Sequence, residues 1–262
     1  MMLQATDLAF GYGRVKIGQG VTLSVDRGEV LCLLGPNGCG KTTLFKTLLG
    51  LLPRQGGSLE LNGKDISTFS RSQFARHIAY VPQATGAYFP FSVFDVVLMG
   101  RASRIDTFAS PTMADRAQTQ EALAALGIGH LAARPFTDIS GGEKQMTLIA
   151  RALAQEPELI VMDEPTASLD FGNQARVLSR ISSFAGSGMA VVISTHDPSH
   201  AFACASRVAL MQSGALVAVG TPQDVLTPQS LQALYGVGVA VAYLEQAGRH
   251  VCTPTLTERN AP

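Results

Sequence analysis

One glycine-rich stretch, residues 35–43 (Gly-Pro-Asn-Gly-Cys-Gly-Lys-Thr-Thr), limits what this chain can fold into more than any other. It follows the largely apolar run 29–34 and leads into residues 44–49, so we expect a buried strand, a tight loop and a helix in succession. The pattern G-x-x-x-x-G-K-[ST] is completed by Gly35, Gly40, Lys41 and Thr42. In that context the pattern predicts a phosphate-binding loop.

The chemistry of this loop follows from its residue types. Glycines let backbone N–H groups curl around a phosphate, and the following helix adds the positive end of its dipole. We expect Lys41 to reach the β- and γ-phosphates of a nucleotide and the Thr42 hydroxyl to hold Mg²⁺. The candidate phosphate ligands are Gly35, Pro36, Asn37, Gly38, Cys39, Gly40, Lys41, Thr42 and Thr43.

Composition places the chain among globular proteins with an ample core. The 262 residues allow one large α/β domain or a core with a subdomain, and 46% are hydrophobic against 15% charged. The 20 basic and 20 acidic residues give a net charge of zero. A broad nucleic-acid surface needs a basic footprint, so we expect no nucleic-acid partner.

Cysteine spacing and hydropathy also exclude some classes of protein. Cys32, Cys39, Cys204 and Cys252 form no C-x-x-C pair, so the spacing predicts neither a zinc site nor a disulfide framework. The chain contains no run of about 18 apolar residues, so we expect no membrane-spanning helix. The first residues lack the charged and apolar regions of a signal peptide, so we expect a cytoplasmic protein.

Short strands and helices are expected throughout the chain. Apolar runs bounded by turn residues predict strands over 3–10, 21–25, 30–34, 58–61 and 78–81. Continuous apolar runs at 159–162 and 189–193 are typical of interior parallel strands. Helices are predicted over 114–126 and 143–154, and a hairpin over 208–211 and 215–219. Residues 236–262 indicate no clear element, and the last ten are expected to fray.

The segment 84–112 has a different character, and its interpretation stays open. Large apolar residues crowd its middle: Phe89, Phe91, Val93, Phe94, Val96, Val97 and Leu98. They predict either a helix that packs inward or a partly exposed apolar patch that receives a partner.

Two carboxylates, Asp163 and Glu164, follow the apolar run 159–162 directly. The carboxyl end of a strand is where α/β sheets place their ligands. A lone Asp-Glu pair there is usually a solvated strand end, but a phosphate loop in the same chain favours a functional interpretation. We then expect Asp163 to support Mg²⁺ and Glu164 to polarise the attacking water.

Two further features have a structural and a functional interpretation. The helix predicted over 143–154 begins with the segment Ser140, Gly141, Gly142 and Glu143. This segment is interpreted either as an anion-binding nest or as a capping box of Ser140 and Glu143. Tyr12 lies in a glycine-rich stretch that we expect to be a loop. Its ring could pack locally or stack on an adenine.

The combination of these motifs resembles the ATP-binding-cassette (ABC) ATPases. Across residues 3–226, the order and spacing match at Lys41, Gln83, Ser140–Glu143, Asp163, Glu164, Ser168, Leu169, Asp170 and His196. The resemblance implies an α/β fold: a P-loop NTPase core with a RecA-like parallel sheet, an antiparallel β subdomain and an inserted α-helical subdomain. The implied divisions are 1–83 (core and β subdomain), 84–156 (helical subdomain), 157–226 (rest of the core) and 227–262 (C-terminal extension).

The resemblance also implies roles for individual residues. Tyr12 would stack on adenine, Gln83 would sense Mg²⁺ and the partner, and His196 would touch the γ-phosphate. Glu164 would be the general base, with Mg²⁺ held by Thr42, Gln83 and Asp163. Residues 140–143 resemble the family signature, which contacts ATP held by a second copy, and Ser168, Leu169 and Asp170 resemble the loop that joins two sites.

Two positions depart from the commonest family pattern, which has Leu where this chain has Ile139 and Gln where it has Glu143. Both residues occur in working members, so activity is still expected.

The resemblance implies a head-to-tail dimer that binds ATP and Mg²⁺ and drives a separate permease. Two copies of a polytopic permease subunit and a periplasmic or extracellular substrate-binding protein would complete the system on the cytoplasmic side of the cell membrane. The segment from Met99 to Pro111 and the Ser-Gly-Gly-Glu-Lys-Gln signature resemble importers of iron–siderophore, haem, cobalamin and molybdate. Within that segment, Gly100, Arg101, residues 107–109 and Pro111 favour the iron-chelate and molybdate or tungstate branch. The alternative is a soluble ABC ATPase that acts in assembly or translation.

Overall fold

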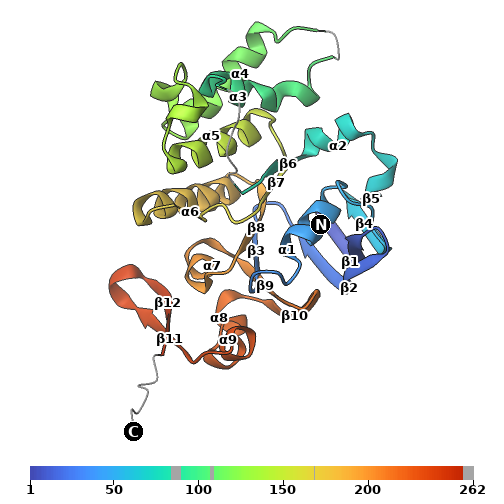
Figure 1. The fold of residues 1–262 in the computed structure, drawn as a ribbon, viewed down its shortest axis with the longest axis vertical. Coiled ribbons are helices and arrows are strands. Elements are labelled where there is room, and N and C mark those ends of the chain that lie inside the picture. The colour runs from blue at the N-terminus through green and yellow to red at the C-terminus, as the bar shows by residue number, and fades with distance from the viewer. Residues whose placement is uncertain (84–89, 107–108, 168, 256–262) are drawn as a thin grey trace.

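A computed structural model describes residues 1–83, 90–106, 109–167 and 169–255. Its centre is a six-stranded sheet in the order β10-β9-β3-β8-β7-β6 (Figure 1). The strands are β3 (Val30–Leu34), β6 (Ile78–Val81), β7 (Leu159–Met162), β8 (Ala190–Thr195), β9 (Arg207–Gln212) and β10 (Ala215–Gly220). All neighbours pair in parallel except the hairpin β9–β10, so the interior parallel strands and this hairpin are confirmed.

Both faces of this sheet are buried, which explains why its strands are continuous apolar runs. Along β3, Val30, Cys32 and Leu34 belong to one hydrophobic cluster, and Leu31 and Leu33 to another. The first cluster lies under α5 (Gly141–Ala154), α6 (Phe171–Gly186) and α7 (Pro198–Cys204). The second lies under α1 (Lys41–Leu48) and a separate antiparallel sheet.

The antiparallel sheet has the order β2-β1-β4-β5. Its strands are β1 (Leu3–Tyr12), β2 (Val15–Val25), β4 (Gly56–Leu61) and β5 (Lys64–Asp65). The first two strands are longer than predicted because Gly11 and Gly18 are strand residues. A Cβ atom on Gly11 would lie 2.0 Å from the Val15 carbonyl oxygen, so this glycine permits close strand approach. Tyr12 therefore ends a strand, and the expected loop position was wrong.

Helices α3 (Val93–Leu98), α4 (Met113–Ala125) and α5 gather at one end of the molecule, at the top of Figure 1. Val93, Val96 and Val97 are buried, while Phe91 is 47% exposed. Most of the described part of the apolar segment therefore packs inward, and Phe89 lies outside the described residues. The short 3-10 helix η2 (Met99–Ser103) continues α3, and α2 (Arg71–His77) lies near it.

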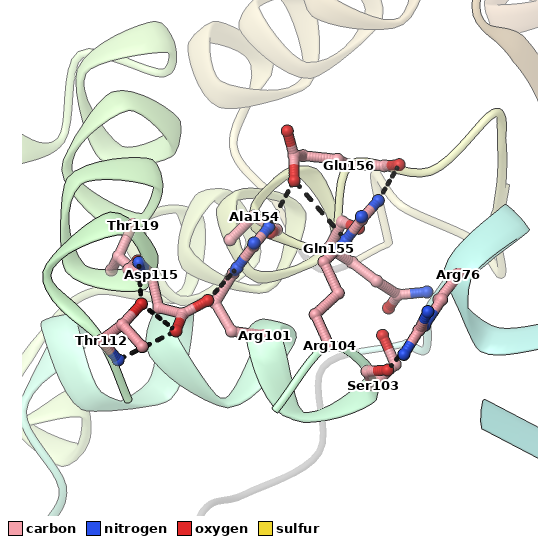
Figure 2. A network of polar contacts seen from close by, with 10 residues as sticks. All are labelled: Arg76, Arg101, Ser103, Arg104, Thr112, Asp115, Thr119, Ala154, Gln155 and Glu156. Carbon is pink, nitrogen blue, oxygen red and sulfur yellow. Dashed lines mark hydrogen bonds and ion pairs between the residues drawn. The ribbon is translucent and has the colours of Figure 1, made fainter. Parts of the chain in front are cut away.

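A buried arginine holds this helical group together (Figure 2). Arg101, on η2, donates to the Asp115 carboxylate of α4 at 3.0 Å. It also donates to the Ala154 carbonyl at 2.7 Å and the Glu156 carboxylate at 2.6 Å, at the end of α5. Asp115 in turn accepts from the backbone N–H and hydroxyl of Thr112, which caps α4.

The C-terminal part is more ordered than the sequence indicated. Helices α8 (Pro222–Val225) and α9 (Pro228–Tyr235) each begin with a threonine cap followed by proline. They are followed by an antiparallel hairpin, β11 (Val239–Leu244) and β12 (Arg249–Pro254), where no element was expected. The strand β12 includes residues 253 and 254, so the predicted fraying of the last ten residues was wrong there. Among the described residues, no helix combines the length and apolar character that crossing a bilayer requires.

Candidate active site

The glycine-rich loop lies between β3 and α1, as the pattern predicts. Gly38 and Gly40 have φ angles of 80° and 107°, a left-handed conformation that favours glycine. A Cβ atom on Gly35 would lie 2.3 Å from the Met211 carbonyl oxygen, so no larger residue fits there. The sequence therefore has glycine at the three points where this loop requires it.

Lys41 is buried, with 5% of its surface exposed. Its Nζ donates to the carbonyl oxygens of Gly35 at 2.6 Å and Pro36 at 3.0 Å. The same nitrogen lies 3.7 Å from Oε1 of Glu164. The loop is thus folded around its own lysine, and the ammonium group faces the carboxylate that follows β7.

The two carboxylates after β7 differ in their surroundings. Asp163 is 4% exposed and accepts a hydrogen bond from Oγ of Ser194 at 2.6 Å. Glu164 has a positive φ of 46°, and its backbone N–H donates to the same Ser194 oxygen at 2.9 Å. Ser194, on the neighbouring strand β8, therefore holds both carboxylate positions together. Burial and the nearby Asp163 carboxylate also raise the pKa of Tyr80, on β6, to about 12.

His196 follows β8 and completes a row of three charged or polar side chains. Its Nδ1 lies 3.3 Å from Oε2 of Glu164, while Oε1 of the same carboxylate faces Lys41. The histidine is 52% exposed. Glu164 thus lies between a buried cation and a half-exposed imidazole.

A cavity of about 400 Å³ opens beside this row. It is lined by Ile17, Asn37, Gly38, Gly40, Lys41, Thr42, Thr43, Gln83 and Glu164. The cavity brings the loop together with Gln83 after β6 and Glu164 after β7. Gly35, Pro36 and Cys39 contribute to the loop but not to the lining, and Asp163, His196 and the exposed Tyr12 do not line the cavity either.

The segment 140–143 lies apart from this cavity and forms the capping box. The Glu143 backbone N–H donates to Ser140 Oγ at 3.3 Å, and the Ser140 N–H donates to Glu143 Oε2 at 2.7 Å. Hydrogen bonds from the Ser140 backbone and hydroxyl lower the pKa of Glu143. Gly141 has open space beside it, whereas a Cβ on Gly142 would lie 2.4 Å from Asn173 Nδ2.

Asp170 caps α6 and supports this contact between helix ends. Its Oδ1 accepts from the Asn173 backbone N–H and its Oδ2 from the Asn173 side chain, both at 2.8 Å. These hydrogen bonds, with that to the backbone of Asn173 the strongest, lower the pKa of Asp170. Leu169 is partly buried against the core, and Ser168 lies outside the described residues.

Comparison with known proteins decides the family. The model of the ABC transporter family matches residues 19–167, which include the loop, the segment 140–143 and both carboxylates. This chain belongs to the ABC transporter family. The ATP-binding subunits of these transporters are ATPases, so the chain is an ABC ATPase.

Curated relatives resemble this ABC ATPase over most of both chains. An uncharacterized ABC transporter ATP-binding protein of Haemophilus influenzae is 43% identical, over 90% of this chain and 89% of its own. The haemin import ATP-binding protein HmuV of Gloeobacter violaceus is 41% identical, over 84% and 82%. The molybdate import ATP-binding protein MolC of Haemophilus influenzae is 39% identical, over 83% and 81%.

A solved structure agrees with the fold. A chain from an inward-facing ABC transporter described as of metal-chelate type superposes with a TM-score of 0.86. It is 35% identical in sequence, and the match covers 97% of each chain.

Some residues at the candidate site of this ABC ATPase were not anticipated from the sequence. Ile17, on β2, lines the cavity, and Ser194 connects Asp163 with Glu164. Tyr235, on α9, donates from its hydroxyl to the carbonyl oxygen of His196 at 2.8 Å. The apolar alternation of β2 was a usable signal for Ile17, but the other two contacts depend on tertiary structure.

Proposed function

We propose that this ABC ATPase is the motor subunit of an importer. Two copies would associate head to tail, hydrolyse ATP and drive uptake through a separate membrane permease. The observation that carries the proposal is similarity over most of both chains to proteins named as import ATP-binding proteins. Recruitment by the permease would place the chain on the cytoplasmic side of the cell membrane.

The cavity beside the glycine-rich loop fits a nucleotide phosphate chain. Backbone N–H groups of residues 35–43 would bind the phosphates, and α1 would add its positive end. Lys41 would exchange the Gly35 and Pro36 carbonyls for oxygens of the β- and γ-phosphates. Such an exchange costs little because these carbonyls belong to the same loop. Tyr12, exposed at the end of β1, would stack on the adenine.

The oxygen donors around the cavity are suited to Mg²⁺. Thr42 offers a hydroxyl, Gln83 an amide oxygen and Asp163 a carboxylate, and Mg²⁺ prefers such hard oxygen ligands together with substrate phosphates. When bound, the ion would neutralise negative charge on the phosphates. Ser194 would keep the Asp163 carboxylate oriented through its 2.6 Å hydrogen bond.

Glu164 is the candidate general base. Its carboxylate is 16% exposed and lines the cavity, where an attacking water could reach it. Lys41 on one side and His196 on the other would keep the carboxylate in place. After ATP binds, His196 would also contact the γ-phosphate, because its half-exposed ring lies beside Glu164.

The remoteness of residues 140–143 from the cavity favours a site completed by a second copy. Ser140 and Gly141 are exposed at the positive end of the 14-residue helix α5. In a head-to-tail dimer this helix end would contact the γ-phosphate held by the other chain. Ser168, Leu169 and Asp170 would lie between the two sites, and loss of the γ-phosphate would loosen the closed dimer.

The permease would dock in a groove of about 690 Å³ that is lined by residues after α1 and by residues of α2, β6, η2 and α5. Its lining includes the exposed Leu51 and Met99 together with Phe69, Phe74, Tyr80 and Arg151. Burial lowers the pKa of Arg151, and no carboxylate among the described residues pairs with it. We therefore expect a permease helix with an apolar face and an acidic residue directed toward Arg151.

The substrate would be a metal chelate or a metal oxyanion. Relatives named for haemin, molybdate and cobalamin import have similar identities of 41%, 39% and 36%, so identity favours none of them. Iron–siderophore, haem, cobalamin and molybdate or tungstate all remain candidates. The permease and a periplasmic or extracellular binding protein would select among them.

The test is recovery of the chain from detergent-solubilised membranes of its source, with its companions identified by mass spectrometry. We expect a polytopic membrane protein in about equal amount, and the substrate-binding protein encoded with it would indicate the substrate class. A matched preparation of an Arg151→Glu variant should lose the membrane protein but remain folded. Recovery of the unaltered chain only from the soluble fraction, with ribosomal or assembly proteins, would contradict the importer proposal.

A further inference from the structure

A direct hydrogen bond joins the C-terminal region to His196. Tyr235 is the last residue of α9, and its hydroxyl donates to the His196 carbonyl oxygen at 2.8 Å, across 39 positions in the chain. Leu231 and Leu234 of the same helix are buried in the main core cluster. Tyr235 therefore projects from a well-anchored helix.

The residues on either side of His196 are tied to α7. Asp197 caps this helix by accepting from the Ser199 N–H at 2.8 Å, and its own N–H donates to Thr195 Oγ1 at 3.1 Å. The Thr195 hydroxyl also lies 3.2 Å from Nδ1 of His200. The carbonyl of His196 itself is held by Tyr235, from a different helix.

The terminal hairpin packs against α7 through β12 (Figure 1). The rings of Phe202 and His250 stack with centroids 5.4 Å apart. Ser199 Oγ and Cys252 Sγ lie 3.3 Å apart. Since α7 begins two residues after His196, these contacts and Tyr235 together hold the histidine segment from two directions.

We propose that Tyr235 is a positioning residue for ATP hydrolysis, which fixes the His196 backbone so that the imidazole stays against Glu164. The imidazole is 52% exposed, so packing alone does not set its direction. The hydrogen bond to the carbonyl restricts rotation of the peptide plane that carries it. This inference rests on the proposed role of His196 in hydrolysis.

The tyrosine is suited to this task because it remains a donor. Burial, with a smaller effect of nearby thiols and Asp197, raises the pKa of Tyr235. Its hydroxyl is therefore protonated throughout the pH range in which an ATPase would work. A phenylalanine at this position would keep the ring and its packing and remove only the donor.

The test begins with Tyr235→Phe in the full-length chain, assayed for ATP hydrolysis. We expect kcat to fall about two- to tenfold, the range that one lost hydrogen bond produces. The KM for ATP should remain at its wild-type value, and the midpoint of thermal unfolding should fall by no more than about 2–4 °C, as one lost hydrogen bond predicts. A wild-type kcat, or a raised KM together with reduced stability, would overturn the proposal in favour of a structural role.

Tyr243→Phe is the matched control. Tyr243 lies on β11, is 57% exposed and packs edge-on against His250 at 5.2 Å. Its hydroxyl makes no hydrogen bond with any residue that the structure describes. This variant loses a tyrosine hydroxyl from the same C-terminal region, and it should hydrolyse ATP at the wild-type rate. An equal loss in both variants would contradict a specific role for Tyr235.

Combining Tyr235→Phe with His196→Ala tests whether Tyr235 acts through the histidine. Single-turnover hydrolysis of radiolabelled ATP measures slow variants as well as fast ones. We expect Tyr235→Phe to cause no further loss in the His196→Ala background. An equal fold-loss in both backgrounds would overturn the proposal. A wild-type rate for His196→Ala alone would instead contradict the proposed role of His196, a result distinct from a wild-type Tyr235→Phe.

Discussion

Two buried cations of this ABC ATPase, Arg101 and Lys41, differ in where their hydrogen-bond acceptors lie in the chain. Both side chains are almost inaccessible, with 8% and 5% of their surface exposed. Arg101 bonds to acceptors 14, 53 and 55 positions away in the chain, so it joins three segments (Figure 2). The carbonyl acceptors of Lys41 lie five and six positions away, in its own loop.

We propose that this difference separates a structural charge, Arg101, from a binding charge, Lys41. The two carboxylates of Asp115 and Glu156 bond directly to Arg101, whereas Glu164 remains 3.7 Å from Lys41. Bonds between distant segments are lost only when the fold opens. Bonds within one loop can be exchanged for a ligand while the fold remains intact.

Replacing each cation by methionine tests this contrast, and we expect the largest effect on the free energy of unfolding. We expect Arg101→Met to lower the free energy of unfolding by about 3–5 kcal/mol, because the Asp115 carboxylate then keeps its hydrogen bonds from Thr112 but loses its opposite charge. Lys41→Met should cost only about 1 kcal/mol, since two loop carbonyls lose one donor. Urea unfolding of the nucleotide-free chain measures both.

Nucleotide binding should show the reverse order. Arg101→Met, at a temperature where it is folded, should bind ATP normally, while Lys41→Met should bind weakly. Equal stability losses in the two variants, or normal ATP binding by Lys41→Met, would show that the two clusters do not differ in this way.

Acid titration of the Arg101 cluster should produce a smaller effect. Hydrogen bonds from Thr112, and then from Arg101, lower the pKa of Asp115 from 3.8 to about 2. Since the unfolded carboxyl takes up its proton at the higher pH, this stabilisation is present above about pH 4 and is lost as the pH falls toward 2. Stability measured from pH 5 to 2 should therefore decline less steeply in Asp115→Asn than in the wild type. Parallel curves would contradict the assigned pKa shift.

The sequence predicts strands of the six-stranded sheet well and the first two strands of the antiparallel sheet less well. Residues 30–34, 78–81 and 159–162 match β3, β6 and β7 because each is an apolar run between breaking residues. The strands β1 and β2 were predicted too short because Gly11 and Gly18 were interpreted as breaks between strands. In the structure these glycines lie within the strands and allow neighbouring backbone segments to approach closely.

Other elements had signals that were not used. In α6, Val177, Ile181 and Phe184 are buried at helical spacing, yet no helix was predicted there. In the terminal hairpin, residues 239–244 alternate between partly buried and exposed over most of the strand, and Gly248 adopts the φ of 61° that a tight turn requires.

At the candidate site, local motifs predict some residues, and tertiary contacts alone reveal others. Lys41 and Glu164 belong to local motifs, and the fold brings them within 3.7 Å. Ser194 and Tyr235 act through partners 31 and 39 positions away, which no local pattern specifies. The capping box of Ser140 and Glu143 was predicted as one of two interpretations, and both remain compatible because the helix end stays exposed.

We propose a mechanism in which one chain provides only half of an ATP site. It is tested most directly with Glu164→Gln, by light scattering during size exclusion with and without ATP and Mg²⁺. We expect a monomer without nucleotide and a dimer with it, together with hydrolysis slowed by roughly 10²–10⁴ through loss of the general base. A variant that binds ATP but remains monomeric, or that hydrolyses it at the wild-type rate, would contradict the account.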